Sequence, residues 1–202
     1  KALCNFVQNG GKPLFNEKSL QNICRTIHDW KINNLMGRFS YQKIERRRIK
    51  KTSLNDDKGN AEKFIQQGLI GTMTDKSSVP EKYLYDAITF DSPLEKDNIL
   101  SDIDGVDVFG KIPKSTIKIP TILGETYSPD FMYIVKRKGK NELNLIVECK
   151  DVKDSETDLR GGEKLKIESA KKFFESLSSA GVNVRFEKQI KSDNLVEIIN
   201  RL

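Results

Sequence analysis

Two acidic residues and a lysine stand where a β-hairpin would bring their side chains together. Asp130 precedes one apolar, β-branched stretch, Glu148 ends another, and Lys150 follows two residues later. Residues 137–141 between the stretches have turn chemistry, and a turn centred on Gly139 places Asp130 opposite Glu148. Opposed residues on antiparallel strands have Cβ atoms about 4.5–5.5 Å apart, and side-chain alternation puts Lys150 on the same face. The spacing therefore predicts a cluster of two carboxylates and one ammonium group.

Such a pair of carboxylates suits a divalent cation. Like charges opposed in a sheet repel each other unless a cation lies between them. Mg²⁺ prefers oxygen ligands and needs only one or two carboxylates besides water and phosphate oxygens. A lysine beside the pair can orient a water molecule and stabilise developing negative charge. In the alternative interpretation, Asp130 is a turn residue, and Glu148 and Lys150 form a surface ion pair.

The surrounding sequence predicts a mixed α/β core that positions these residues. Short β-branched runs punctuated by Pro and Gly predict strands, and apolar residues at three- or four-residue spacing predict helices. The predicted strands are 106–109, 116–119, 131–135, 143–147 and 182–186, and the predicted helices are 16–34, 61–67, 81–88, 93–100, 162–180 and a C-terminal helix capped by Ser192. Val147 and Cys149 are expected to point into the core, away from the acidic cluster.

The first part of the chain differs in charge from the rest. Residues 1–60 hold 13 Lys and Arg against 5 Asp and Glu, whereas residues 61–202 hold 22 against 24. A basic segment beside an acid-containing body favours a polyanion bound next to a cation site. We therefore expect a small N-terminal α+β region, residues 1–79, packed on or linked to a core over residues 80–202.

Composition narrows the possible chemistry. The chain has 202 residues with one histidine and three cysteines, and no two cysteines have C-x-x-C spacing. This excludes tetrahedral zinc sites and histidine-based triads, and it favours the reducing cytoplasm. Trp30 and His28, the only histidine, are expected to be core and boundary residues of the first helix. No apolar run approaches the roughly 18 residues that cross a bilayer, no secretory signal is present, and Lys1 as first residue suggests a piece of a longer polypeptide.

One string favours a nucleotide-binding interpretation, which we reject. Gly105–Lys111 matches most of a phosphate-binding loop, but Ile112 stands where that motif needs a hydroxyl group. Pro113 also prevents a helix from beginning at the lysine. We therefore expect no ATP site in this chain.

Three longer strings resemble a known family. They are Phe90–Glu95 (FDSPLE), Phe109–Lys114 (FGKIPK) and Thr126–Phe131 (TYSPDF), and they precede the triplet ECK that ends at Lys150. Together they resemble the C-terminal endonuclease region of the restriction (Res) subunit of type III restriction enzymes, within the PD-(D/E)xK nuclease superfamily. The resemblance implies a restriction-endonuclease-like α-β-β-β-α-β core with a mixed central sheet flanked by helices. It also implies a Mg²⁺-dependent, site-specific deoxyribonuclease.

The resemblance assigns roles within the site. Asp130 and Glu148 would hold Mg²⁺, with Mn²⁺ as a substitute and the main-chain carbonyl of Cys149 as a further ligand. Lys150 would position the attacking water or stabilise the transition state of phosphodiester hydrolysis. A glutamate on the first core helix often reaches the metal in this class, and Glu95 occupies that place. In the alternative interpretation, Glu95 only completes the capping box of its helix, and the two roles can coexist.

The expected partners follow from the same resemblance. Double-stranded DNA is the implied substrate. The full subunit would carry an ATP-dependent, helicase-like motor and would associate with a methyltransferase (Mod) subunit, so ATP would act only in the motor. The basic residues that would contact DNA phosphates, or that alternatively form a solvated face, are Lys166, Lys171, Arg46, Arg48 and Lys50. The alternative functions are a non-cleaving DNA-binding or docking module on a nuclease fold, and a repair- or resolvase-type nuclease of that fold.

Overall fold

The computed structural model describes residues 16–44, 51–136, 142–150, 161–191 and 193–202. The chain forms two compact units, Lys1–Arg38 and Phe39–Leu202. The predicted boundary between residues 79 and 80 falls inside the second unit and stays a prediction. No helix within the described ranges is long and apolar enough to cross a membrane.

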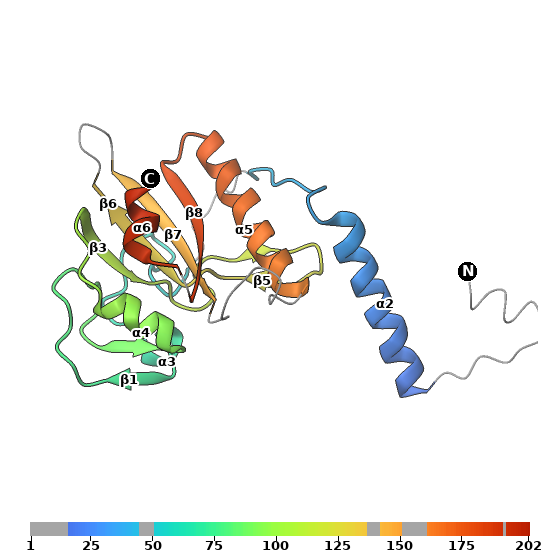
Figure 1. Cartoon of the computed structure of the whole chain (residues 1–202), viewed down its shortest axis with the longest axis horizontal. Coiled ribbons are helices and arrows are strands. Elements are labelled where there is room, and N and C mark those ends of the chain that lie inside the picture. The colour runs from blue at the N-terminus through green and yellow to red at the C-terminus, as the bar shows by residue number, and fades with distance from the viewer. Residues whose placement is uncertain (1–15, 45–50, 137–141, 151–160, 192) are drawn as a thin grey trace, which may run out of the picture. The chain divides into compact units, whose positions relative to one another are not determined.

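The second unit is built on a four-stranded sheet with the strand order β3-β6-β7-β8. The strands are β3 (Val106–Lys111), β6 (Phe131–Val135), β7 (Leu143–Lys150) and β8 (Val184–Ile190). β6 pairs antiparallel with both β3 and β7, whereas β8 runs parallel to β7. The central sheet is therefore mixed, and the predicted mixed α/β class is confirmed (Figure 1).

Helices cover both faces of this sheet (Figure 1). On one face, α4 (Pro93–Leu100) and α6 (Leu195–Asn200) pack on core side chains of β3, β6 and β7. On the other face lies α5 (Gly161–Ser179), whose predicted apolar stripe buries Ala170 and Phe174. α5 is also the crossover connection that the parallel pair β7–β8 requires.

β7 is buried from both sides, which explains its nearly continuous apolar sequence. Val147 is 0% exposed on one face, and Ile146 is 3% exposed on the other. Cys149 is buried in the same core as Val147, as predicted. Packing on both sides therefore fixes the position of a charged residue at the end of this strand.

Shorter elements complete the unit. α3 (Gln67–Ile70) precedes a two-stranded sheet of β1 (Met73–Asp75) and β2 (Ile88–Phe90). A second pair, β4 (Ile119–Pro120) and β5 (Thr126–Tyr127), lies between β3 and β6 in the chain. β2 lies just before α4 in the chain, and β5 lies just before β6.

Two of the predicted helices are wrong. Residues 81–88 form no helix, because their backbone bonds to the edge strand β3: the Leu84 amide donates to the Phe109 carbonyl at 2.8 Å. Residues 61–67 are helical only at Gln67, where α3 begins. Local apolar spacing does not reveal a distant strand edge that offers the backbone better hydrogen bonds.

The two ends of the chain show smaller differences. α2 (Glu17–Leu35) begins as predicted, with Asn16 Oδ1 accepting a hydrogen bond from the Ser19 amide at 2.9 Å. Its apolar stripe is exposed, however, and Trp30 is 58% exposed, so the predicted core position of Trp30 is wrong. Helical spacing shows that a helix has an apolar face but not what covers it. At the other end, α6 is capped by Asn194, and the predicted cap Ser192 lies outside the described residues.

Candidate active site

The hairpin of β6 and β7 has the register that the sequence predicts. Phe131 pairs with Val147, so one step outward Asp130 reaches the position beside Glu148. The turn itself, 137–141, lies outside the described residues. Three strand ends meet here, because β3 ends, β6 begins and β7 ends at this edge of the sheet.

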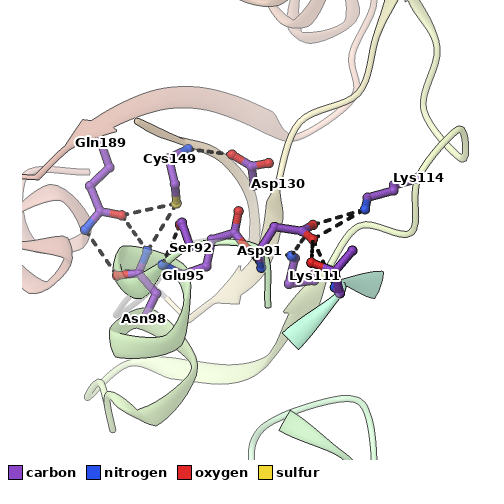
Figure 2. Close-up of polar contacts among 10 residues, drawn as sticks. Asp91, Ser92, Glu95, Asn98, Lys111, Lys114, Asp130, Cys149 and Gln189 are labelled. Carbon is purple, nitrogen blue, oxygen red and sulfur yellow. Dashed lines mark hydrogen bonds and ion pairs between the residues drawn. The ribbon is translucent and has the colours of Figure 1, made fainter. Parts of the chain in front are cut away.

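Asp130 is tied to both neighbouring segments by hydrogen bonds. Its Oδ2 accepts a hydrogen bond from the Cys149 amide at 2.8 Å (Figure 2). Its carbonyl accepts a second bond from the Ile112 amide, just beyond β3, at 2.7 Å. The carboxylate is therefore held by the Cys149 amide, and the backbone of Asp130 is held by the Ile112 amide.

Glu148 is held from two sides. The residue is 2% exposed. Its Oε1 pairs with Lys150 Nζ at 2.7 Å, and its Oε2 accepts a short hydrogen bond from the Tyr127 hydroxyl. Lys150 Nζ also lies 3.9 Å from Glu163 Oε1 in α5. Each carboxylate oxygen of Glu148 thus has a different protein partner.

The charges in this group are not balanced. Burial and the negative charge of Glu148 raise the pKa of Asp130 well above its usual value. Burial would lower the pKa of Lys150, but the Glu148 carboxylate outweighs it and the pKa is raised. Burial and Glu148 also raise the pKa of Tyr127, so its hydroxyl remains a donor. Within the part of the chain that the structure describes, Lys150 pairs with Glu148 but not with Asp130, and a bound cation would relieve the repulsion between the two carboxylates.

Glu95, the predicted third carboxylate, belongs to a second set of contacts (Figure 2). Its Oε2 accepts a hydrogen bond from the Asp91 amide at 2.7 Å and pairs with Lys111 Nζ at 2.5 Å. Ser92 Oγ accepts from the Glu95 amide at 3.3 Å, so the predicted capping contact is present. Glu95 therefore has a structural role here, and its role as a metal ligand stays a prediction.

Lys111 is a buried cation that sequence reasoning missed. It is 4% exposed and pairs with both Glu95 and, at 3.4 Å, Asp91 Oδ2. Asp91 Oδ2 lies in turn 3.2 Å from Lys114 Nζ. A signal was present in the sequence, since continuing the predicted strand two residues beyond Phe109 places Lys111 on the same core-facing side.

Tyr127 is the second residue that sequence reasoning missed. It lies in the two-residue strand β5 and is 7% exposed. So short a strand has no periodicity that could have indicated its burial. Its place three residues before Asp130, in one of the strings that carry the family resemblance, was the only available signal.

The thiol of Cys149 faces away from the carboxylates. Its Sγ accepts a hydrogen bond from Asn98 Nδ2 at 3.2 Å, and Asn98 and Gln189 exchange hydrogen bonds of 2.6 and 3.1 Å (Figure 2). All three side chains are buried, and burial raises the pKa of the thiol. The thiol is therefore engaged in the core, and metal binding by the main chain of Cys149 stays a prediction.

Residues 81–193, which include every residue of this site, match a family model described as an endonuclease domain. The chain belongs to this endonuclease family. It is 37% identical over 188 residues to the Res subunits of two type III restriction-modification enzymes, EcoP15I of Escherichia coli and EcoPI of Escherichia phage P1. The StyLTI Res subunit of Salmonella typhimurium is 26% identical over 212 residues. The predicted resemblance to type III Res subunits is confirmed.

These alignments cover most of this chain but little of the relatives. The two more similar subunits align with 91% of this chain and the third with 100%. The endonuclease chain spans only 19–20% of the length of these relatives. No solved structure gave a significant match.

The structure places two of the predicted DNA-contacting residues on α5 of the endonuclease domain. Lys166 Nζ lies 3.8 Å from Glu125 Oε2. Lys171 is exposed and lines a cavity between α5 and β8 together with Arg185. The remaining candidates lie outside the described residues: Arg46, Arg48 and Lys50. DNA contact by all five stays a prediction.

The endonuclease domain fits a divalent cation through its acidic pair. Within the described ranges, no group of three or more His, Cys, Asp or Glu side chains could share a metal ion. Asp130 and Glu148 nevertheless supply hard oxygen donors, and burial and the charge of Glu148 raise the pKa of Asp130, so a bound cation would stabilise its charged form. Mg²⁺ needs no more carboxylates than these two.

Proposed function

We propose that this domain cleaves DNA by divalent-cation-dependent hydrolysis of phosphodiester bonds, at the site formed by Asp130, Glu148 and Lys150. The observation that carries the proposal is a buried carboxylate, Glu148, beside a half-buried one, Asp130, with Lys150 paired to Glu148, where β3 and β7 end and β6 begins. Two like charges held close together and partly away from water lower the free energy of unfolding, and a bound cation would offset that cost. Such pairs are characteristic of functional sites. Membership of the endonuclease family supports the same interpretation.

The ligands would be the carboxylates of Asp130 and Glu148 and the main-chain carbonyl of Cys149. All three are oxygen donors, which Mg²⁺ requires and Mn²⁺ also accepts. When bound, the cation would supply Lewis acidity, which promotes deprotonation of water and polarises the scissile phosphate. The hydrogen bond from the Cys149 amide fixes Asp130 for this task.

Lys150 would act on the reacting atoms. Hydrolysis adds a water oxygen to phosphorus and breaks one P–O ester bond, and the departing oxygen takes up a proton. The ammonium of Lys150 is held by Glu148 at 2.7 Å and keeps its proton because its pKa is raised. It can therefore donate hydrogen bonds to the attacking water and to the phosphate oxygens as negative charge develops on them.

Glu95 is not proposed as a direct ligand of the cation in the arrangement that the structure shows. It is bound to Lys111 and would reach a cation only by exchanging that partner. Behind burial and Glu148, its negative charge is a further cause that raises the pKa of Asp130. We propose that Glu95 supports cation binding mainly through this charge.

We further propose that this domain is the nuclease of a type III Res subunit. The relatives are Res subunits by name, and such a subunit would supply the helicase-like motor, its ATP site and contact with a Mod methyltransferase. The order α4, β3, β6, β7, α5, β8, with β4–β5 as an insertion, supports a restriction-endonuclease-like α-β-β-β-α-β core.

Nicking of supercoiled plasmid tests this function. The 202-residue chain is incubated with Mg²⁺, Mn²⁺ or EDTA, beside Asp130→Ala and a matched surface variant, Asp107→Ala. We expect nicking only with metal, a loss of at least about 1,000-fold in Asp130→Ala, and wild-type activity in Asp107→Ala, because a ligated cation contributes several kcal/mol to the transition state. If neither the chain nor a complete Res–Mod complex containing it cleaves DNA, the non-cleaving docking module replaces this proposal.

A further inference from the structure

The hydroxyl of Tyr127 binds the carboxylate oxygen of Glu148 that Lys150 does not bind. It donates a short hydrogen bond to Glu148 Oε2, whereas Lys150 Nζ binds Oε1 at 2.7 Å. Each carboxylate oxygen of Glu148 thus has its own bonding partner. A single partner would leave the carboxylate free to turn about its bond, but two partners on different oxygens define one orientation.

The packing of the tyrosine ring fixes where this hydroxyl lies. Tyr127 is 7% exposed and belongs to the core formed under α5, together with Ile119, Ile146 and Phe174. Its backbone is also paired, since Tyr127 is the partner of Ile119 in the β4–β5 sheet. Because the ring is packed on its neighbours, its hydroxyl has a fixed position, whereas Lys150 reaches Glu148 through a long side chain with several rotatable bonds.

We propose that Tyr127 is a positioning residue that orients Glu148 for cation binding. The inference rests on the proposed function. Side chains that hydrogen-bond to metal ligands set the orientation of those ligands, and their loss typically weakens metal affinity or activity by about 10–100-fold. In this role Tyr127 touches neither the cation nor DNA, and it acts only through the carboxylate of Glu148.

Two other tyrosine hydroxyls of the domain make a useful contrast. The hydroxyls of Tyr83 and Tyr133 are also buried, but they find no hydrogen-bond partner among the described residues. Tyr133 lies on β6 in the core on the opposite face of the sheet. Among the described residues, the bond to Glu148 therefore distinguishes Tyr127 from these two tyrosines.

The test compares two variants that each remove a single hydroxyl, Tyr127→Phe and Tyr133→Phe. Mn²⁺ binding to the 202-residue chain is measured by titration without DNA, and thermal unfolding is measured in EDTA. We expect Tyr127→Phe to weaken Mn²⁺ binding about 10–100-fold while Tyr133→Phe leaves it unchanged. The melting temperatures should show that both variants remain folded. Unchanged Mn²⁺ affinity in folded Tyr127→Phe would overturn the inference.

A positioning role also predicts how catalysis fails. Cleavage by Tyr127→Phe should need a higher Mn²⁺ concentration but recover most of its maximal rate when Mn²⁺ is saturating. Glu148→Gln should not recover at any Mn²⁺ concentration, because it lacks a ligand rather than its orientation. If the wild-type chain itself fails to bind Mn²⁺, the proposed function is contradicted. If the wild-type chain binds Mn²⁺ and Tyr127→Phe binds it equally well, only the positioning role of Tyr127 is contradicted.

Discussion

Two groups of carboxylates and lysines lie near the strand ends of this endonuclease domain, and they differ in their balance of charge. The β7 group consists of Asp130, Glu148 and Lys150, and the α4 group consists of Asp91, Glu95, Lys111 and Lys114. In the β7 group the carboxylates outnumber the ammonium groups, whereas in the α4 group the two are equal in number. The buried carboxylate of Glu95 therefore has a charged partner, and the excess of carboxylates in the β7 group supports the cation site proposed there.

The pKa values of one aspartate from each group express this difference. Burial and Glu148 raise the pKa of Asp130. Burial would also raise the pKa of Asp91, but a hydrogen bond from Thr72 and the positive charge of Lys111 outweigh it, and the pKa is lowered. The charged form of Asp130 is thus disfavoured and that of Asp91 favoured, which agrees with the cation site proposed at Asp130.

The largest loss of unfolding free energy is expected from removing the buried ammonium group of Lys111 in the α4 group. Lys111→Met would leave Glu95 buried without its ammonium partner, which costs roughly 3–5 kcal/mol of unfolding free energy. Urea-induced unfolding measures this loss. The matched control is Lys136→Met, whose partner Asp107 lies on the surface and whose loss is expected to cost less than about 1 kcal/mol. Equal losses in the two variants would mean that Lys111 does not hold the α4 group together.

The two aspartates should respond to neutralisation with opposite signs. Without metal, Asp130→Asn should stabilise the protein at pH 7, because the raised pKa makes the charged carboxylate unfavourable in the folded state. Asp91→Asn should destabilise it, because the lowered pKa means that the charged form is favoured. A tenfold change in the acid dissociation constant of either carboxyl group on folding corresponds to about 1.4 kcal/mol of unfolding free energy.

The pH dependence separates these two effects further. The penalty from Asp130 is absent at low pH and develops as pH rises above about 4, the usual pKa of aspartate, so the gain in Asp130→Asn should grow from pH 4 to pH 7. The contribution of Asp91 is present above about pH 4 and is lost as pH falls through its lowered pKa. Unfolding in EDTA from pH 7 down to well below pH 4 measures both, and changes of the same sign would contradict the comparison.

The smallest effect on Mn²⁺ affinity is expected from Glu95→Gln, which tests whether Glu95 belongs to the α4 group alone or also binds the cation. Glutamine can still accept hydrogen bonds from the Asp91 amide and from Lys111, and Lys111 keeps the Asp91 carboxylate as a charged partner at 3.4 Å, so the loss of unfolding free energy should be smaller than in Lys111→Met. Mn²⁺ affinity should fall by less than about tenfold, since Glu95 acts on the β7 group mainly through its charge. Titration of Mn²⁺ beside Asp130→Asn checks this, and an equally large loss in both variants would make Glu95 a direct ligand.

Much of the site could be predicted because it depends on periodicity and turn chemistry. The register that sets Asp130 beside Glu148 follows from strand alternation and one turn, and Asn16 and Ser92 cap their helices as their residue types predict. Lys111 could not be assigned in this way, because a lysine is ordinarily exposed, and only the carboxylates that α4 brings to it make its burial possible.

Sequence alone determined the acidic pair, the lysine beside it, the mixed α/β class and the family resemblance, since each depends on residue type and local spacing. Tertiary structure alone decided that residues 82–84 bond to β3, that Tyr127 reaches Glu148 and that the α4 group balances its charges. These outcomes join segments far apart in the chain. Their energies come from burial and from hydrogen bonds between side chains that meet only after folding, so no local pattern contains them.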